Sequence, residues 1–400
     1  MPESQTGSPA FSRRLYLLSA TFCFIFMGAG AQQAYLVPYL GRVTDWSQVQ
    51  CSATIALVYL SMLIFRVVNI YLFPRWSDRR FTIVGSLTYL FFTLAMFAVP
   101  YFPSYGFAMA SAFLWGMGGA MMWTGTAMQT LDMADKAGGR HGTGIGILYS
   151  STHLGWLTGA IVLGIIYDAL PVETAQYLYA VAAGITLIGN ILAAFIPATG
   201  QALRETPSLS GLLEMMVGPR ALISGLLQFT AALGYGLVLG VFGKYIEATY
   251  GAEWIGRSIW LYPAVRMVLS LFGGYSSDRI GHTPVLVIGF LAGALGLEVT
   301  IAWESPFAVL ITVATLGLLS STVPVVAAAM VGDASTIQRR PLAYGIVFAW
   351  RDLGVAVAAI GASILGLSLD LDAAFRVFIY IFTGCGLLSL YLGRFAEQRI

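Results

Sequence analysis

The sequence contains few charged residues. Asp, Glu, Lys and Arg make up only 10% of the 400 residues, whereas 58% are hydrophobic. A soluble protein carries roughly 25% charged residues, because they cover its surface. With a mean hydropathy of +0.79, the chain is expected to lie in a membrane. The net charge is only +2, and no basic run is interleaved with aromatic residues, so no nucleic-acid partner is expected.

Other scarce features exclude further classes. The three cysteines, Cys23, Cys51 and Cys385, lie far apart in apolar stretches, a spacing that suits neither a zinc site nor a disulfide framework. No phosphate-binding loop of the ATPase type occurs, which argues against ATP-driven transport by this chain alone. No cluster of metal ligands and no spaced nucleophile–base pair appears, so we expect no enzyme, no metal and no cofactor.

The second half of the chain repeats features of the first at a spacing of 200 residues. The repeated positions are Arg66 and Arg266, Asp78-Arg79 and Asp278-Arg279, and Arg140 and Arg340. Parallel repeats of this length build transporters whose binding site lies between the halves. The sequence therefore predicts an all-α membrane protein of two similar six-helix bundles, residues 1–196 and 220–400.

Twelve apolar segments are long enough to cross a bilayer, which takes about 20 residues each. They lie near 15–37, 51–73, 82–100, 105–131, 143–167, 174–196, 220–243, 258–274, 284–303, 306–331, 342–368 and 373–393. The linker 197–219 is polar, but after Pro207-Ser208 its apolar residues recur at helical spacing, which predicts a short amphipathic helix. Such a helix would lie on the membrane surface or pack beneath the bundles.

Basic residues are unevenly distributed between the two sides of the predicted membrane. Fourteen of the 21 fall on the side of the termini, four fall on the other side, and three lie within spans. Because cytoplasmic loops are enriched in Lys and Arg, both termini are predicted to be cytoplasmic, in a multi-pass protein of the plasma (inner) membrane.

The loop after the eighth span carries a recognisable motif. Gly274-Tyr-Ser-Ser-Asp278-Arg279-Ile-Gly281-His282 resembles the loop signature of the major facilitator superfamily, which occurs between helices 2 and 3 and again between helices 8 and 9. The first copy keeps Asp78-Arg79 but lacks both glycines. The resemblance implies a twelve-helix alternating-access fold and a gating role for these four residues. Asp78 would bind the start of helix 11 and Asp278 the start of helix 5, where the helix dipole favours an anion. The alternative is a solvated turn without a gating role.

Helix 5 carries a second pattern, made of Gly146, Gly155, Gly159 and Gly164. It is similar to the fifth-helix signature of proton-driven exporters in the superfamily. It departs from that signature at Ala160, where the family has proline, and at Leu163, where it has glycine. Small residues at this spacing also allow helices to approach closely, so packing is the alternative explanation.

Five ionisable residues fall within the predicted spans: Arg66, Arg266, Arg351, Asp352 and His153. Charges at this depth are costly unless paired or hydrated, which makes them candidate site residues. The superfamily fold, which sets helix 2 beside helix 11 and helix 5 beside helix 8, implies contacts of Arg66 with Asp352 and of Arg266 with His153. Surplus arginine would attract a carboxylate or phosphate, and Asp352, His153 and Arg351 are candidates for proton coupling. The alternative is that Arg66 and Arg266 extend toward water.

Uncharged polar and aromatic residues supply further candidates. Helices 1, 4, 7 and 10 line the cavity in the superfamily fold, which implies substrate contacts from Gln32, Gln33, Gln228 and Trp123. Tyr35 and Tyr235, again 200 residues apart, are expected to be matching cavity aromatics. Ordinary interhelical hydrogen bonds are the alternative for the glutamines.

We therefore expect a monomeric secondary transporter that contacts membrane lipids and moves a small organic anion coupled to protons. One alternative is a proton-coupled exporter of lipophilic or amphipathic compounds, favoured by the helix 5 glycines and the aromatic content. Another is a membrane regulator of the same fold that transports nothing.

Overall fold

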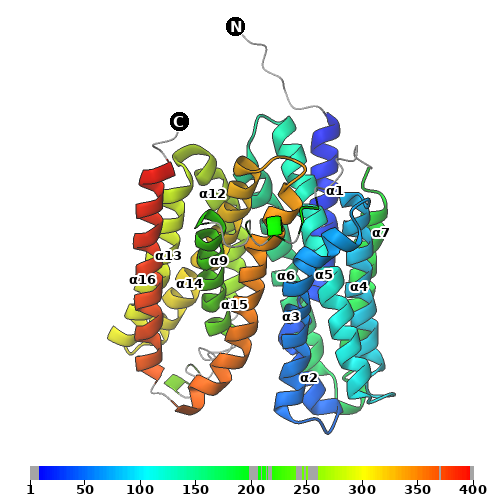
Figure 1. Cartoon of the computed structure of the whole chain (residues 1–400). Helices are drawn as coiled ribbons and strands as arrows, with labels where there is room; N and C mark the ends of the chain where they lie inside the picture. The colour runs from blue at the N-terminus through cyan, green and yellow to red at the C-terminus, as the bar shows by residue number, and fades with distance from the viewer. Residues whose placement is uncertain are drawn as a thin grey trace.

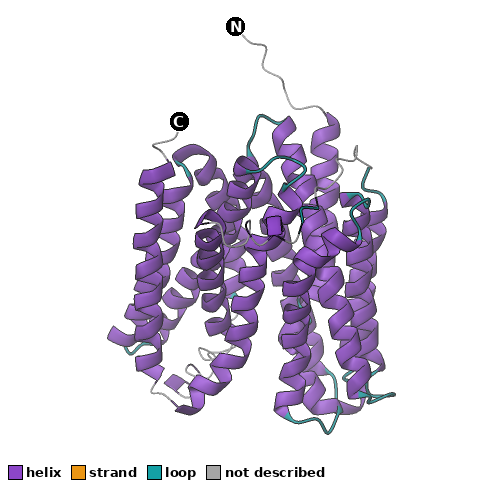
Figure 2. Cartoon of the chain, viewed as in Figure 1, coloured by secondary structure: helices purple, strands orange, loops and turns teal. Residues whose placement is uncertain are grey.

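The computed structural model describes residues 9–197, 206–208, 210–212, 214, 219–239, 246, 249–250, 260–368 and 371–396. Within these ranges every regular element is a helix (Figure 2). The first half contains α1 (Pro9–Ile25), η1 (Phe26–Gly30), α2 (Gln33–Val43), α3 (Gln48–Leu72), α4 (Asp78–Ala98), α5 (Tyr105–Lys136), α6 (His141–Ala169), η2 (Val172–Thr174) and α7 (Tyr177–Ala194). The second half contains α9 (Pro219–Leu239), α12 (Leu261–Ile280), α13 (His282–Ala302), α14 (Pro306–Ala334), α15 (Arg340–Ser368) and α16 (Leu371–Ala396).

The helices form two groups that stand side by side (Figure 1). Helices α1–α7 make up one group and α9–α16 the other, and α1 begins at the same end of the molecule where α16 ends. The twelve predicted segments each correspond to one helix, with α1, η1 and α2 together forming the first. The predicted fold of two six-helix bundles is confirmed. The boundaries of the linker remain a prediction.

Five helices of the described chain are long and apolar enough to cross a membrane by length and composition alone. They are Ala53–Leu72, Asp78–Ala98, Val172–Ala194, His282–Ala302 and Pro306–Asp333. Some of the remaining long helices carry charged residues: α12 contains Arg266, Asp278 and Arg279, and α15 contains Arg351 and Asp352. Arg266, Asp278 and Asp352 face the other bundle, so part of the charge that interrupts the apolar pattern of these helices lies where the two bundles meet.

The first span is broken by a single π-helical turn. The amide of Ala31 donates to the carbonyl of Phe26, five residues earlier, at 2.9 Å. A β-carbon at Gly28 would lie 2.3 Å from the carbonyl oxygen of Ala182 in α7, so glycine allows the turn to approach that helix. Such turns are frequent at functional sites because they shift the helical register of the residues that follow. Here the residues that follow include Gln33.

Glycines set the closest contacts between the bundles. A β-carbon at Gly142 of α6 would lie 2.5 Å from the carbonyl oxygen of Gly274 in α12. On the other side of the interface, a β-carbon at Gly345 of α15 would lie 2.4 Å from the carbonyl oxygen of Arg66 in α3. The helix pairs α6/α12 and α3/α15 therefore approach nearly to backbone contact.

The predicted amphipathic helix at 209–217 falls largely outside the described residues. Among the positions that are described, the carbonyl of Pro207 accepts a hydrogen bond from the Tyr71 hydroxyl at 3.0 Å. Leu212 packs against the cluster formed by Ile70, Leu342 and Ile346. These contacts place this part of the linker against the ends of α3 and α15.

Candidate functional site

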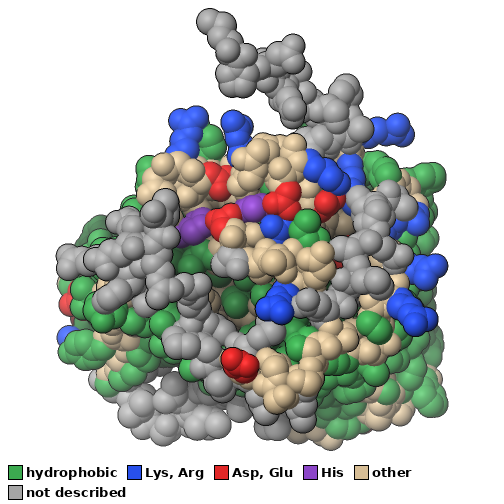
Figure 3. All heavy atoms as spheres, turned by 45° about the horizontal axis from the view of Figure 1, so that its top comes forward, with side chains coloured by type: hydrophobic (Ala, Val, Ile, Leu, Met, Phe, Trp, Pro, Cys, Tyr) green, Lys and Arg blue, Asp and Glu red, His purple; other side chains and the backbone are tan. Residues whose placement is uncertain are grey.

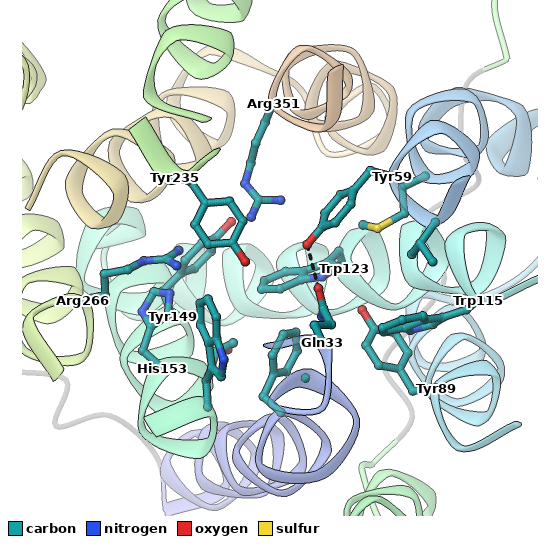
Figure 4. A pocket seen from close by; sticks show the side chains of 16 residues that line it. Gln33, Tyr59, Tyr89, Trp115, Trp123, Tyr149, His153, Tyr235, Arg266 and Arg351 are labelled. Atoms are coloured by element: carbon teal, nitrogen blue, oxygen red, sulfur yellow. Dashed lines mark hydrogen bonds between the residues drawn. The ribbon is translucent and has the colours of Figure 1, made fainter. Parts of the chain in front are cut away.

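A cavity lies between the two bundles, and its empty space, open solvent included, is about 630 Å³. The first bundle contributes mainly aromatic side chains, among them Tyr59, Tyr89, Trp115, Trp123, Tyr149 and Trp156. The second bundle contributes Tyr235, Arg266 and Arg351 (Figure 4). The cavity thus combines an aromatic wall with basic groups.

Arg266 of α12 is 5% exposed and lies in an aromatic cage. Its guanidinium carbon is 5.4 Å from the ring centre of Trp156, 5.5 Å from that of Tyr235 and 5.2 Å from that of Tyr262. Contacts of this kind stabilise the cation through the ring faces. Within the described part of the chain, no carboxylate forms an ion pair with Arg266, and its Nε is buried without a hydrogen-bond partner.

Arg66, Asp352 and Arg351 form a second charged group beside the cavity. The Nε of Arg66 donates to Oδ2 of Asp352 at 2.8 Å, and both side chains are fully buried. Nη1 of Arg351 donates to the other oxygen, Oδ1, at 3.3 Å. One carboxylate is therefore shared by two arginines. The sequence argument from the superfamily fold placed Arg66 against Asp352, and this contact is present; the roles of both residues remain predictions.

His153 of α6 also lines the cavity, next to Arg266 (Figure 4). Its Nδ1 lies 3.2 Å from the Ser270 hydroxyl of α12, one helical turn beyond Arg266. The two halves of the chain therefore meet at this histidine. Its predicted part in proton coupling remains a prediction.

A continuous row of aromatic rings runs along the cavity. Ring centres are 5.3 Å apart for Trp115 and Tyr89, 6.0 Å for Tyr89 and Phe26, and 5.3 Å for Phe26 and Trp123. The row continues from Trp123 to Tyr149 at 5.3 Å. Apart from Trp123, these aromatic residues were not identified from the sequence, because helical periodicity does not distinguish a lumen-facing ring from one in the bundle core.

The predicted polar contacts divide into two sets. Gln33, Trp123 and Tyr235 line the cavity, and Gln33 accepts a hydrogen bond from the Tyr59 hydroxyl at 2.8 Å. Three other predicted residues do not line it. Gln32 donates to the Thr93 hydroxyl at 2.9 Å, Tyr35 to the carbonyl of Ala160 at 2.6 Å, and Gln228 to that of Val323 at 3.4 Å. For Gln32 and Gln228 these are interhelical bonds of the kind that the sequence left open as the alternative.

Asp278 binds the start of α6. Its Oδ1 accepts the amide of Gly142 at 2.8 Å, and its Oδ2 accepts the amide and hydroxyl of Thr143 at 2.7 and 2.6 Å. The carboxylate therefore satisfies amides that the first turn of a helix leaves unpaired, and its charge complements the helix dipole. This is the contact with helix 5 that the family motif implies.

The other three residues of the predicted gate are arranged differently. Arg79 donates to the carbonyls of Ala194 and Ile196 at the end of α7, within its own bundle. Arg279 lies over the ring of Tyr275 at 4.4 Å. Asp78 begins α4, and its contact with the start of helix 11 remains a prediction.

The face where α1 begins and α16 ends, here called the terminal face, carries a further group that the sequence argument missed. His141 of α6 lies between two carboxylates: its Nδ1 is 2.5 Å from Asp333 of α14, and its Nε2 is 2.7 Å from Asp135 of α5. Asp135 also binds Arg340, the first residue of α15, and Asp333 binds His282 at 2.8 Å. Figure 3 shows these acidic and histidine side chains gathered across the face. We call Asp135, His141, Asp333 and Arg340 the terminal-face network.

The network joins the two bundles, since Asp135 and His141 belong to the first and Asp333 and Arg340 to the second. The hydrogen bond to Asp333 raises the pKa of His141; burial opposes this, and the bond to Asp135 adds to it. Burial works to raise the pKa of Asp135, but the bonds from Arg340 and His141 outweigh it and lower that pKa. A sequence signal did exist, because Asp135 and Asp333 lie near the ends of matching helices, each shortly before a member of the repeated pair Arg140 and Arg340.

The helix 5 glycines lie at close contacts. β-carbons at Gly155 and Gly159 would lie 2.0 and 1.9 Å from the carbonyl oxygens of Cys23 and Met27 in the first span. At Gly146 the nearest atom would be the Ser270 carbonyl oxygen, at 2.7 Å. Packing therefore accounts for these glycines. In the described part of the chain, no group of His, Cys, Asp and Glu side chains is arranged to hold a metal ion.

Comparisons with known proteins agree with this architecture. Solved structures similar to the chain include a Major Facilitator Superfamily transporter, FucP, in the outward conformation, with a TM-score of 0.76 and 13% identity over 96% of this chain and 99% of that one. A second structure, of a variant of the E. coli fucose:proton symporter FucP, gives the same values. The proton:xylose symporter XylE bound to 6-bromo-6-deoxy-D-glucose has a TM-score of 0.76 and 15% identity over 96% of both chains. At these identities the likeness concerns the fold.

A search of curated protein sequences gave no significant match. The family model of the Major Facilitator Superfamily, in contrast, matches residues 17–265 and 224–397, which together cover nearly the whole chain. With its two six-helix bundles and a cavity between them, this multi-pass membrane protein belongs to the major facilitator superfamily of transporters.

Proposed function

We propose that the chain is a secondary active transporter that works by alternating access and carries a small organic anion with, or in exchange for, protons. The observation that carries the proposal is Arg266, a nearly buried cation in the cavity wall that forms no ion pair with a described carboxylate. A buried charge without a partner is costly, so a site of this kind favours a ligand of opposite charge.

The balance of charge beside the cavity supports an anionic substrate. Three arginines, Arg66, Arg266 and Arg351, lie in or next to the cavity, and Asp352 is the carboxylate that binds two of them. A carboxylate or phosphate of the substrate would compensate part of this excess, and the planar guanidinium can bind either one through two parallel hydrogen bonds.

Proton coupling would use the group around Asp352. In this conformation two arginines bind its carboxylate. When the two bundles separate during transport, α3 moves away from α15. Arg66 then moves away from Asp352. A carboxylate left in an apolar site with fewer cations takes up a proton more readily. Binding and release of a proton would thus follow the conformational change.

The direction of the chain in the membrane is part of the proposal. The terminal face is cytoplasmic, as the distribution of basic residues predicts. The contacts of Asp278 with α6 and the terminal-face network hold the bundles together on that side. This closed face corresponds to the outward-facing state of the transport cycle, and these contacts must break before the substrate can leave to the cytoplasm.

One observation favours the second candidate, a proton-coupled exporter of amphipathic compounds. Much of the cavity wall is aromatic, which would also suit a lipophilic cation or neutral drug. The charge distinguishes the two: an exporter of lipophilic cations would have a carboxylate in the wall, whereas the charged groups among the described residues that line this cavity are Arg266 and Arg351.

Transport in proteoliposomes tests the proposal. Uptake of radiolabelled acetate, lactate, succinate and benzoate would be compared with that of xylose and uridine, with and without an imposed pH gradient. We expect uptake of at least one anion, stimulated by the gradient and abolished in Arg266→Gln. Arg42→Gln is the matched control, because Arg42 also lies over a ring, that of Tyr167 at 4.1 Å, but outside the cavity lining. Uptake of neutral solutes alone, or anion uptake retained in Arg266→Gln, would refute the proposal, and flux of no solute at all would favour the non-transporting regulator.

A further inference from the structure

Arg266 and the aromatic pair Trp115 and Tyr89 lie at opposite ends of the cavity, while other rings, among them Tyr235, lie beside Arg266. Arg266 and His153 lie at one end, and Trp115 and Tyr89 lie at the other, with Tyr59 and Gln33 between them (Figure 4). The two ends also come from different helices, α12 and α6 at the basic end and α4 and α5 at the aromatic end. A ligand that spans the cavity therefore meets a cation at one end and ring faces at the other.

We propose that this site selects an aryl carboxylate, a planar aromatic ring that carries a single carboxylate. The carboxylate binds Arg266, and the ring lies along the aromatic row toward Trp115. The inference rests on the proposed function, because it assigns the substrate class of that same anion site.

The charges limit the ligand to one carboxylate. Arg351 already donates to Asp352, so Arg266 is the guanidinium in the cavity wall that forms no ion pair among the described residues. Among the described lining residues, no Lys or Arg lies with Trp115 and Tyr89; Arg66 lies near Tyr89 but outside the lining, and it is bound to Asp352. The neighbouring side chains there, Val58 and Met62, are apolar. A second carboxylate at that end would be buried without a partner, which is strongly unfavourable.

The burial and spacing of the rings in this row explain why the site would prefer an aromatic ligand. Trp115 is 1% exposed and Tyr89 is 3% exposed, so a ligand that reaches them leaves water. Successive rings from Trp115 to Tyr149 are 5.3–6.0 Å apart, within the 4.5–7 Å range of favourable aromatic pairs. An additional ring that enters the cavity would lie among these rings. Each such pair contributes about two- to tenfold in affinity beyond the burial of apolar area.

Four probes separate the contributions of charge and ring. Acetate carries the charge without the ring, benzyl alcohol the ring without the charge, benzoate both, and terephthalate a second carboxylate opposite the first. Binding of each to the purified full chain in detergent is measured by isothermal titration calorimetry at constant pH. We expect benzoate to bind at least about tenfold more tightly than acetate, benzyl alcohol and terephthalate.

Two variants with matched controls test which end of the cavity binds the carboxylate and which binds the ring. Arg266→Gln should reduce benzoate affinity at least about tenfold, whereas Arg42→Gln should leave it unchanged. Trp115→Leu should lower benzoate affinity several-fold and leave acetate affinity unchanged. Phe92→Leu is its control: Phe92 stacks on Trp115 at 4.3 Å and is equally buried, but it does not line the cavity. Monodispersity and thermal unfolding show that each variant is folded, and the comparison of the four probes on the unaltered chain does not depend on any variant.

The outcomes distinguish this inference from the proposed function. Equal affinity for acetate and benzoate, or for terephthalate and benzoate, would overturn the aryl carboxylate; loss of acetate binding in Arg266→Gln would then leave the anion transporter intact. If benzyl alcohol binds as tightly as benzoate and Arg266→Gln changes neither, charge plays no part, and both proposals fail. Absence of benzoate binding would also overturn the inference, while the uptake of other anions would still support the proposed function.

Discussion

Arg66 and Asp352 connect the two bundles through a hydrogen bond of 2.8 Å between Nε and Oδ2, and both side chains are fully buried. They stand on α3 and α15, which approach nearly to backbone contact at Gly345. The remaining nitrogens of Arg66, Nη1 and Nη2, are buried without a hydrogen-bond partner. This pair therefore stabilises the interface only while both side chains are present.

Removal of one partner should destabilise the protein strongly. Asp352→Asn leaves Arg66 and Arg351 without a carboxylate in a buried site, at a cost of about 3–5 kcal/mol. The double variant Arg66→Met with Asp352→Leu removes the fully buried pair. Only Arg351, whose side chain is 17% exposed, then lacks its carboxylate, so much of this loss should be recovered. Thermal unfolding of the purified proteins in detergent measures both effects.

An exposed ion pair provides the control for this experiment. Lys136 binds Asp132 at 2.9 Å, but the Lys136 side chain is 64% exposed. Lys136→Met should change stability by no more than about 1 kcal/mol, because water screens such pairs. The prediction would be contradicted if Asp352→Asn and Lys136→Met had the same thermal unfolding midpoint. It would also be contradicted if the double variant Arg66→Met with Asp352→Leu were less stable than Asp352→Asn.

Loss of the Asp278 carboxylate should open the terminal face. Asn at this position keeps one acceptor oxygen and no charge, so at least one of the three hydrogen bonds from Gly142 and Thr143 is lost together with the helix-dipole contribution. A weakening of about 2 kcal/mol would move the equilibrium between closed and open forms roughly 30-fold.

Spin labels at the exposed positions Arg80 and Ile280, one in each bundle, would report this change as a longer distance in Asp278→Asn. Asp132→Asn is the control, because Asp132 binds Arg14 and Lys136 within the first bundle only. An unchanged distance distribution in Asp278→Asn would mean that this carboxylate does not hold the face closed.

The family motif and the charges were readable from the sequence because each has a fixed position relative to the spans. Asp278 follows a motif glycine at the end of a helix, and Arg66 and Asp352 stand out as charges in apolar segments. The superfamily fold implies which helices lie next to the helix of Arg66. The matching depth of Arg66 and Asp352 in their spans then predicts the contact between them.

Gln32 and Gln33 show what the sequence could not supply. They are adjacent, yet Gln33 lines the cavity and Gln32 binds Thr93 within the bundle. The π-turn at Phe26–Gly30 rotates all later residues of the span relative to a regular α-helix, and no residue pattern in the sequence predicted this turn. The terminal-face network was missed for a related reason: His141 and Asp333 stand at helix ends, where helical periodicity does not show which residues face one another. The repeated positions of Asp135 and Asp333 before Arg140 and Arg340 are the sequence signal for it.

Closure of the terminal face should weaken as pH rises above neutrality. His141 has a raised pKa in the closed form, chiefly because it binds Asp333, with burial opposing and Asp135 assisting. The two carboxylates that contact His141 also bind other basic groups: Asp135 binds Arg340, and Asp333 binds His282. Opening separates His141 from Asp333, so its pKa falls back toward the ordinary value of about 6.5. Protonated His141 therefore favours closure; the contribution is complete below about pH 6.5 and is lost as pH rises through the raised pKa.

The label pair at Arg80 and Ile280 should accordingly show more of the open form at pH 9 than at pH 6, and His141→Gln should abolish most of that difference. His282→Gln is the matched control, since His282 and Asp333 belong to the same bundle and their bond does not cross the interface. A pH response that persists in His141→Gln, or that disappears equally in His282→Gln, would exclude His141 as its source.

At Gly142, where α6 lies closest to α12, an added methyl group should not be tolerated. A β-carbon at Gly142 would lie 2.5 Å from the carbonyl oxygen of Gly274 and 2.6 Å from Oδ1 of Asp278. Backbone atoms cannot move aside as a flexible side chain can, so Gly142→Ala should force the helix ends apart and favour the open terminal face. The expected result is a longer distance between the bundle labels and slower uptake, while the protein remains folded.

Gly184→Ala separates this steric effect from the general effect of replacing glycine in a helix. Gly184 lies in α7 with no atom within 4 Å of the added β-carbon, so alanine there should be neutral or slightly stabilising, because it restricts the unfolded chain. If Gly142→Ala closes and transports as well as Gly184→Ala does, glycine at position 142 is not required for closure.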